Sequence, residues 1–306
     1  MRPLLFTLPG SEEFGAQLHP FLFCDIGDLQ IHHFPDQECC PRFVTPVVGR
    51  DVIFAQLLDR PESKIMPLYL AACVARELGA RSVGIVIPYL PYMRQDARFK
   101  EGEGETARHF ARLISSCCDR LVTVDPHLHR YHQLSELYTV PTKVAFAAPE
   151  IAKWIIGNVI RPVIFGPDAE SEQWIAEIAE AADCPYVVLN KTRHSSDSNV
   201  EVSIPDASFW VGMTPVLIDD IVSTARTMIA ATLQIELAGM APPVCIAVYP
   251  LFAGNAFAAL QACGVDRIVS CNTIAHATNQ INLCQPIAAA VDEALELMRV
   301  IPSTAK

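Results

Sequence analysis

Short apolar runs alternate with amphipathic segments along most of the chain. The runs are typical of strands buried on both faces of a sheet, and the segments between them have the helical period of apolar residues. We predict strands starting near residue 51 and over 81–89, 120–124, 162–165, 186–189, 215–218, 244–250 and 267–270. We predict helices over 64–78, 105–118, 148–155, 171–182, 255–263 and 286–300. This alternation predicts an α/β fold with mostly parallel sheets.

The strand–helix alternation restarts after the segment 141–144, which indicates a second domain. The 306 residues are enough for two α/β domains. We therefore expect domains over 1–145 and 146–306. The pattern leaves open whether the last helix, 286–300, packs on the second domain or returns to the first.

One stretch, VLIDDIVSTART, has the pattern of a phosphate-binding turn. Residues 216–218 are expected to end a buried strand, Asp219 and Asp220 follow, and a loop of mostly small residues precedes a helix. The loop residues are Ser223, Thr224, Ala225, Arg226 and Thr227. Backbone N–H groups and the helix dipole favour phosphate there.

The two carboxylates restrict which phosphate fits this turn. Asp219 and Asp220 would repel a bare phosphate, but they suit a ligand that also carries hydroxyls or a divalent cation. A sugar phosphate meets both conditions. The alternative is an ordinary strand-to-helix turn with an acidic N-terminal cap.

Two further loops carry polar groups after predicted strands. Arg94, Gln95 and Asp96 lie in a cationic loop after strand 81–89, where guanidinium groups suit phosphate and base recognition. A solvated connection is the alternative. Lys191 and Arg193 lie in the polar stretch 189–200, which we expect to be a flexible loop that places positive charge on a transferring phosphoryl group. A hairpin tip with incidental cations is the alternative.

Two strand ends carry candidate metal ligands. His127 follows strand 120–124, and Asp168 follows strand 162–165. Ligands of open α/β sheets gather at the carboxyl ends of strands, and Mg²⁺ prefers one or two carboxylates together with substrate phosphates. A histidine in such a position is at least as often a capping residue.

Composition and charge exclude some classes of partner. The net charge of −11 argues against nucleic acid and anionic membranes. The eleven cysteines lack CxxC spacing, no apolar run is long enough to span a membrane, and the first residues do not resemble a secretory signal. We expect free thiols in a cytoplasmic protein.

Six motifs in order resemble the ribose-phosphate pyrophosphokinase (phosphoribosyl pyrophosphate synthetase) family over nearly the whole chain. The motifs are FPDQE, RQDARFKEGE, VDPHLH, GPDAES, NKTR and DDIVSTART. Their spelling is closer to the archaeal-type branch. The resemblance implies two tandem domains of the type I phosphoribosyltransferase fold, a homo-oligomer, and transfer of the β,γ-diphosphate of ATP to the anomeric hydroxyl of ribose 5-phosphate.

The resemblance also implies roles for individual residues. Asp219 and Asp220 would hold the ribose hydroxyls, and residues 223–227 the 5-phosphate. Mg²⁺ would be held by His127 and Asp168, and the moving diphosphate stabilised by Lys191 and Arg193. ATP would be bound by Arg94, Gln95 and Asp96, with Phe34, Asp36 and Glu38 reaching the adenine site across a subunit interface.

Three departures from the family pattern bear on activity. Arg226 stands where the family has glycine, Ser223 where many relatives have Asp, and GPDAES replaces PDxGG. They keep two alternatives open: a catalytically weak regulatory paralogue of such a synthetase, or a phosphoribosyltransferase. The ATP-type loop and the Lys191/Arg193 segment speak against the phosphoribosyltransferase.

Overall fold

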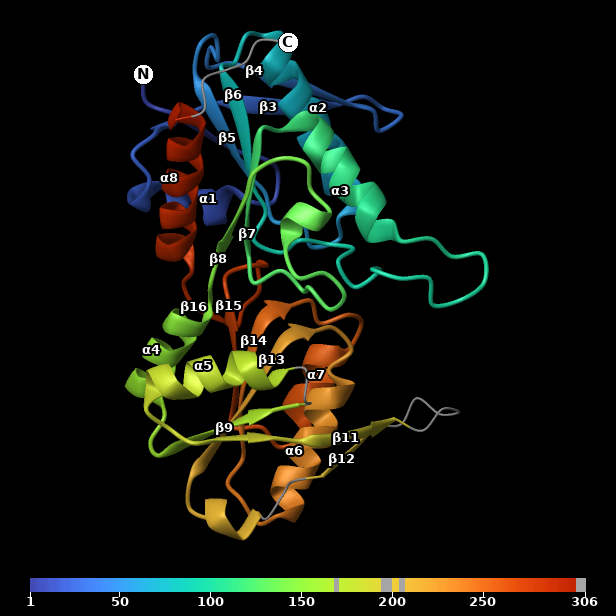
Figure 1. Ribbon diagram of the computed structural model, residues 1–306, viewed down its shortest axis with the longest axis vertical. Coiled ribbons are helices and arrows are strands. Elements are labelled where there is room, and N and C mark those ends of the chain that lie inside the picture. Colours follow the sequence, from blue (N-terminus) through green and yellow to red (C-terminus); the bar gives the residue numbers. More distant parts are fainter. Residues whose placement is uncertain (168–170, 194–199, 204–206, 301–306) are drawn as a thin grey trace. The chain divides into compact units, whose positions relative to one another are not determined.

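The chain is divided into two compact units, each with its own parallel sheet (Figure 1). The computed structural model describes residues 1–167, 171–193, 200–203 and 207–300. Unit 1 comprises residues 1–146 together with the segment that starts at Cys284, and unit 2 comprises residues 147–283. The six-stranded sheet of each unit is parallel throughout, as the alternation of strands and helices predicts.

Unit 1 has the sheet order β2-β1-β5-β6-β7-β8. Its strands are β1 (Leu4–Thr7), β2 (Asp25–Ile26), β5 (Asp51–Ala55), β6 (Ser82–Val86), β7 (Arg120–Val124) and β8 (Thr142–Ala145), and β3 (Leu29–His33) pairs with β4 (Cys39–Phe43) in a separate antiparallel hairpin. Its helices are α1 (Glu12–Leu18), α2 (Glu62–Glu77), α3 (Thr106–Cys117), α8 (Cys284–Val300) and the short η1 (His19–Phe21) and η2 (Leu134–Glu136). All residues of β5, β6 and β7 are buried, which explains their continuous apolar character.

The last helix returns to unit 1. Helix α8 packs against β7, β8 and α1, and Lys143 of β8 forms an ion pair with Glu293 of α8 at 2.7 Å. Its buried residues include Val291 and Ala294. The chain therefore leaves unit 1, forms the whole of unit 2, and completes unit 1 afterwards.

Unit 2 has the sheet order β10-β9-β13-β14-β15-β16. Its strands are β9 (Pro162–Gly166), β10 (Tyr186–Val188), β13 (Thr214–Val222), β14 (Val244–Pro250), β15 (Arg267–Cys271) and β16 (Asn279–Ile281), and β11 (Asn190–Arg193) pairs with β12 (Val200–Ser203) in an antiparallel hairpin. Its helices are α4 (Ala148–Asn158), α5 (Glu172–Ala182), α6 (Arg226–Leu237), α7 (Ala256–Ala262) and the short η4 (Ala207–Trp210). Apolar residues of α6 and α7 pack with those of β9, β13 and β14 in the core.

Three elements differ from the sequence prediction in ways that affect the site. Strand β6 ends at Val86 rather than at residue 89. Strand β13 continues to Val222 instead of ending at residue 218, because Asp219 pairs with Ala247 and Val222 pairs with Pro250 of β14. Residues 190–193, expected in a flexible loop, form strand β11, because they pair with β12.

Candidate functional site

In unit 1 the loops that follow β6 and β7 meet at the carboxyl edge of the sheet. The carbonyl of Pro88 accepts hydrogen bonds from the Val124 N–H and from the Thr123 hydroxyl, both at 3.2 Å. Further along, the Asp96 carboxylate lies 3.6 Å from Nε of Arg130. The structure therefore joins the segment of Arg94–Asp96 to the segment that starts with His127.

The three predicted nucleotide-binding residues of the first loop differ in exposure. Arg94 and Gln95 are exposed, whereas Asp96 is 7% exposed. Hydrogen bonds fix the backbone of this loop, from the Gln95 N–H to the Tyr92 carbonyl at 2.9 Å and from the Ala107 N–H to the Gln95 carbonyl at 3.2 Å. Among the described residues, Oδ2 of Asp96 has no hydrogen-bond partner. A buried carboxylate oxygen in that state is a ready acceptor for a donor on a ligand.

The loop after β7 places His127 at the same edge. Its backbone turns at Asp125, which has a φ of 25°, and His127 is half-buried with its ring centroid 6.0 Å from that of His129. Tyr131 donates a hydrogen bond to Glu105 at 3.2 Å, and so links this loop to the start of α3. The sequence prediction did not include Arg130 or Tyr131; their position directly after the HLH triplet was the available signal.

The predicted adenine-contacting residues lie on the turn between β3 and β4. Phe34 donates its N–H to the Glu38 carbonyl at 2.8 Å, and Asp36 Oδ1 accepts the Glu38 N–H at 3.2 Å. All three side chains are exposed. No described hydrogen bond joins this turn to the Arg94–Asp96 loop.

In unit 2 Asp219 and Asp220 lie near the end of β13, and the turn expected from the sequence follows that strand and leads into α6. Asp219 and Asp220 are half-buried, and Asp220 Oδ1 accepts the Ile221 N–H at 2.7 Å. The loop base is held by the β14–α7 connection, where the Phe252 N–H binds the Val222 carbonyl at 3.0 Å and the Ala253 N–H binds the Ser223 carbonyl at 2.9 Å.

The start of α6 leaves its first N–H groups available for an anion. Ala225, at the N-cap position, has left-handed backbone angles of φ 58° and ψ 6°, and no described side chain caps the helix. An uncapped helix N-terminus favours a phosphate. Thr224 and Arg226 are exposed beside it, and Ser223 and Thr227 are half-buried.

The neighbouring strand β9 ends beside the two carboxylates. Phe165 pairs with Leu217, so the residues after Gly166 begin next to Asp219. A Cβ on Gly166 would lie 2.6 Å from Ser171 Oγ and 2.5 Å from Ile175 Cδ1, so the glycine permits close packing of α5. Asp168, the predicted magnesium ligand on this connection, lies outside the described residues.

Lys191 and Arg193 occupy alternate positions of β11, where the backbone pairs them with Val202 and Val200. Their place in a paired strand corrects the expectation of a flexible loop at these two positions. The prediction that they act on a phosphoryl group concerns their charge and is not changed by this backbone assignment.

The described part of the chain contains neither a ready-made cluster of metal ligands nor a membrane-spanning helix. No group of three or more His, Cys, Asp or Glu side chains there is arranged to hold a metal ion. No helix among those residues is long and apolar enough to cross a membrane.

Comparisons with known proteins agree with these two units. Residues 4–117 match the N-terminal domain of ribose phosphate pyrophosphokinase, and residues 135–283 match the phosphoribosyl transferase domain. The ribose-phosphate pyrophosphokinase of Sulfolobus acidocaldarius is 31% identical, over 83% of this chain and 88% of its own length. The chain belongs to the ribose-phosphate pyrophosphokinase family.

Other relatives in the ribose-phosphate pyrophosphokinase family extend the match. The enzymes of Halobacterium salinarum and Methanopyrus kandleri are 31% and 29% identical, each over 94% of this chain and nearly all of their own length. These named relatives are archaeal, as the spelling of the motifs predicted. The crystal structure of phosphoribosylpyrophosphate synthetase from Mycobacterium smegmatis has the same fold, with a TM-score of 0.84 at 21% identity over 97% of this chain and 100% of that chain.

Proposed function

We propose that this protein transfers the β,γ-diphosphate of ATP to the anomeric hydroxyl of ribose 5-phosphate, giving phosphoribosyl pyrophosphate and AMP. The observation that carries the proposal is the uncapped N-terminus of α6, which starts at Arg226, after the short turn that follows Asp219 and Asp220 of β13. Donors for a phosphate and acceptors for sugar hydroxyls follow each other within nine residues of chain, 219–227. Family membership supports the same reaction.

Ribose 5-phosphate is assigned to unit 2. The N–H groups at the start of α6, together with the hydroxyls of Ser223, Thr224 and Thr227, would bind the 5-phosphate. Asp219 and Asp220 would accept hydrogen bonds from the ribose hydroxyls, an acceptor role that ionised carboxylates fill.

ATP is assigned to unit 1. The exposed Arg94 and Gln95 suit the phosphates and the base, and the buried Asp96 offers its unpartnered oxygen to a donor such as an amino group or a ribose hydroxyl. Phe34, Asp36 and Glu38 would contact the adenine of a neighbouring subunit in a homo-oligomer. Their exposure on the β3–β4 turn supports this assignment.

The protein side chains present are sufficient for a Mg²⁺ ion that takes most of its ligands from the substrates. This ion takes one or two protein carboxylates together with water and phosphate oxygens, so a dedicated cluster of three protein ligands is not required. His127 and Asp168 would hold it. When bound, Mg²⁺ would neutralise charge on the phosphates of ATP.

The reaction requires the protein to position the two substrates and to supply positive charge, and it needs no nucleophile from the protein. The anomeric oxygen attacks the β-phosphorus of ATP, the bond from that phosphorus to the α-phosphate oxygen breaks, and AMP leaves. Lys191 and Arg193 would stabilise the negative charge on the moving diphosphate. The proton of the anomeric hydroxyl passes to solvent or to a nearby base.

Phosphorus NMR tests the proposed reaction directly. With ATP, Mg²⁺ and ribose 5-phosphate, we expect AMP to appear together with a new diphosphate signal at the anomeric position. An Asp219→Asn/Asp220→Asn variant should bind ATP as the parent does but lose most of its affinity for ribose 5-phosphate in calorimetry. Binding of both substrates by the parent without turnover would contradict the proposal and favour a regulatory paralogue.

A further inference from the structure

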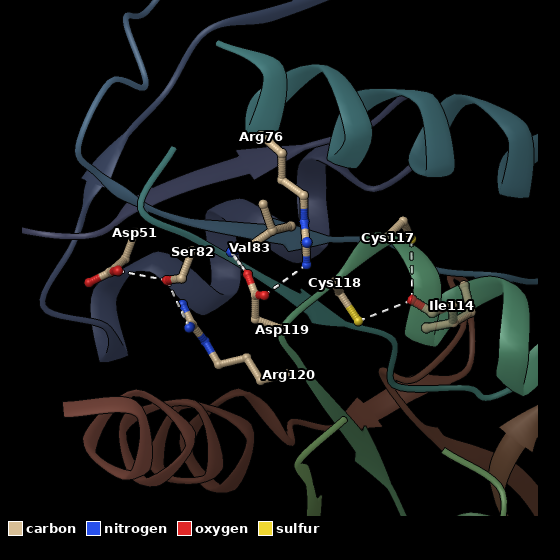
Figure 2. A network of polar contacts seen from close by, with 9 residues as sticks. All are labelled: Asp51, Arg76, Ser82, Val83, Ile114, Cys117, Cys118, Asp119 and Arg120. Atoms are coloured by element: carbon tan, nitrogen blue, oxygen red, sulfur yellow. Dashed lines mark hydrogen bonds and ion pairs between the residues drawn. The ribbon is translucent and has the colours of Figure 1, made fainter. Parts of the chain in front are cut away.

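Each unit holds a network of polar side chains at one end of its strands, and the two networks differ in which end they occupy. In unit 1 Asp51, Ser82 and Arg120 are the first residues of β5, β6 and β7 (Figure 2). Arg120 Nη1 donates a hydrogen bond to Ser82 Oγ at 3.0 Å, and Ser82 Oγ donates to Asp51 Oδ1 at 2.6 Å. This network lies at the amino edge of its sheet, away from the edge where α/β sheets bind ligands. The network of unit 2 lies at the carboxyl end of β15, on the edge that carries the phosphate turn, residues 223–227.

The connection between β14 and α7, residues 251–255, holds the phosphate turn in place. Consecutive N–H groups of Phe252 and Ala253 donate to the carbonyls of Val222 and Ser223, at 3.0 Å and 2.9 Å. Phe252 has a φ of 37°, in the left-handed region that a residue with a Cβ rarely adopts. A residue in such a conformation keeps it only where its surroundings fix it. The backbone of Phe252 therefore depends on the contacts of its buried side chain.

Three rings pack together around Phe252. Its ring centroid lies 4.8 Å from that of His276 and 5.4 Å from that of Phe257, and the rings of Phe257 and His276 are 5.0 Å apart. These distances are typical of favourable aromatic pairs. Phe257 belongs to α7, directly after the same connection, whereas His276 comes from the connection between β15 and β16. His276 is thus the ring that connects Phe252 to another part of unit 2.

The His276 ring is itself fixed by hydrogen bonds. The Thr278 N–H donates to His276 Nδ1 at 3.3 Å, so Nδ1 is an acceptor and the proton of the neutral ring lies on Nε2. The Thr278 hydroxyl lies 2.8 Å from the same nitrogen and 2.7 Å from the hydroxyl of Ser270, which is fully buried in β15. The His276 N–H donates to Asn279 Oδ1 at 2.6 Å. Burial lowers the pKa of His276, which favours the neutral ring in this acceptor state.

We propose that His276 is a positioning residue for the binding of ribose 5-phosphate. Its ring holds Phe252, and the backbone of residues 252–253 holds the phosphate turn at the start of α6. The inference rests on the proposed function, because it takes the 5-phosphate as the ligand of that turn. His276 acts through Phe252 and not by contact with the substrate.

A positioning role predicts a selective effect on one substrate. The 5-phosphate is remote from the anomeric hydroxyl that reacts, so its binding contributes equally before and during the transfer. Loss of the His276 ring should therefore weaken the binding of ribose 5-phosphate and leave kcat and the affinity for ATP nearly unchanged. A general loss of stability would lower Tm and would not discriminate between the two substrates.

Calorimetry and initial-rate kinetics of His276→Ala and His276→Phe test the proposal. We expect His276→Ala to raise the dissociation constant and the KM for ribose 5-phosphate about tenfold, because two aromatic contacts are lost. The dissociation constant for ATP and kcat should stay within about twofold of the parent values. His276→Phe keeps the ring and should retain the affinity for ribose 5-phosphate within about threefold. Ile178→Val, which removes a buried methyl group from α5, controls for lost stability and should change neither affinity.

Thr278→Val covers a His276→Ala variant that fails to fold. It keeps all three rings and removes the hydroxyl that orients His276, and it should raise the KM for ribose 5-phosphate about threefold.

Hydrogen exchange tests the same contacts without a substrate. The amides of Phe252 and Ala253 should exchange faster in His276→Ala than in the parent protein, whereas the amides of α4 should not. Equal exchange of the two amides, or equal affinity of parent and His276→Ala for ribose 5-phosphate, would overturn the role of His276 alone. Failure of the parent protein to bind ribose 5-phosphate would overturn the proposed function as well.

Discussion

Ala225 has a backbone conformation that favours glycine. Its φ of 58° lies in the left-handed region, which costs a residue with a Cβ about 1–2 kcal/mol. This turn directs the chain from β13 into α6 and leaves the helix N-terminus uncapped. The unfavourable angle is therefore found at the position that shapes the proposed phosphate site, as is common at functional turns.

Arg226 is the first residue of α6 and is exposed, with no positive φ. Its backbone therefore does not require glycine, and we expect its guanidinium to attract the 5-phosphate. Arg226→Gly should raise the KM for ribose 5-phosphate about three- to tenfold, because one charge-assisted interaction is worth roughly 1 kcal/mol more than a neutral one. Initial-rate kinetics measure the change.

A charge control separates this effect from the overall field. Lys153→Ala removes one positive charge from α4 of the same unit, where Lys153 pairs with Glu150 at 2.6 Å. It should leave the KM for ribose 5-phosphate unchanged. Faster turnover of Arg226→Gly with an unaltered KM would mean that the arginine hinders the site instead.

The composition of this turn was predictable, and its backbone angles were not. Small residues between a predicted strand and a predicted helix indicated a phosphate-binding turn. Arg226 stands where the family has glycine, so the sequence suggested that any unusual backbone angle would be at that position. The left-handed residue is Ala225, because the direction of the chain between β13 and α6 decides which residue adopts it. A non-glycine residue at positive φ leaves no mark in the sequence.

At the scale of elements, Gly84 lets the side chain of one strand cross its neighbour. Gly84→Ala would bring a methyl group within 2.7 Å of Arg120 Nε and 3.1 Å of its Cγ. We expect a loss of about 1–3 kcal/mol of unfolding free energy, the usual cost of overpacking a core. Urea denaturation followed by circular dichroism measures it.

Gly157 of α4 is the matched control for this substitution. A Cβ there has no described atom within 4 Å. Gly157→Ala should raise the unfolding free energy by up to about 1 kcal/mol, because alanine favours the helix. Equal effects of the two substitutions would contradict the close contact between Gly84 and Arg120.

Strand β11 offers a test of the proposed phosphoryl-transfer charges. Lys191→Ala should lower kcat by about 10²–10³-fold with little change in Tm, because charge placed on a transition state acts on the rate and not on folding. Thr192→Ala, one residue along the same strand, is the control and should retain most of kcat. Near-normal turnover of Lys191→Ala would remove the lysine from the mechanism.

The apolar strands were the most predictable elements. Strands β7 and β14 have the predicted bounds, and all of their residues are buried. Strand β13 was predicted too short, because its half-buried carboxylates resemble a loop in the sequence. Strand β11 was missed, because its partner β12 and not its own polar composition makes it a strand.

At the scale of the whole molecule, the sequence predicted which site residues lie together on the parallel sheet of a unit, but it did not predict where the other site residues lie relative to them. The rule that ligands gather at the carboxyl ends of parallel strands led to the Arg94–Asp96 loop and His127, which the structure joins through Arg130. No such rule applies to the β3–β4 turn, because that turn belongs to a separate antiparallel hairpin. The position of that turn depends on tertiary contacts that residue spacing does not encode.

The network at Asp51 predicts how the stability of unit 1 depends on pH. Burial alone would raise the pKa of Asp51, but hydrogen bonds from Arg81 and Ser82 and the charges of Arg81 and Arg120 hold it below its ordinary value. The extra stability is present above the unfolded-state pKa of about 3.9 and is lost as the pH falls through the lower folded-state pKa.

Asp51→Asn should lower the urea midpoint at pH 7 and flatten its fall below about pH 4. Urea titrations between pH 3 and 7 give both quantities. Glu77→Gln, on an exposed position of α2, is the control and should keep the acid dependence of the parent protein. An unchanged dependence in Asp51→Asn would show that other carboxylates control acid unfolding.

The return of α8 to unit 1 has a consequence for synthesis on the ribosome. Residues 147–283 form unit 2 without a break, whereas unit 1 needs a helix that is translated after all of them. The first half of the chain therefore lacks α8, and the face of β7 and β8 stays uncovered, while the ribosome synthesises the second half. During that time unit 2 can already fold. We infer that the unit translated later reaches its native state first, and that the nascent amino-terminal half depends on chaperones or on its own partial order until α8 emerges.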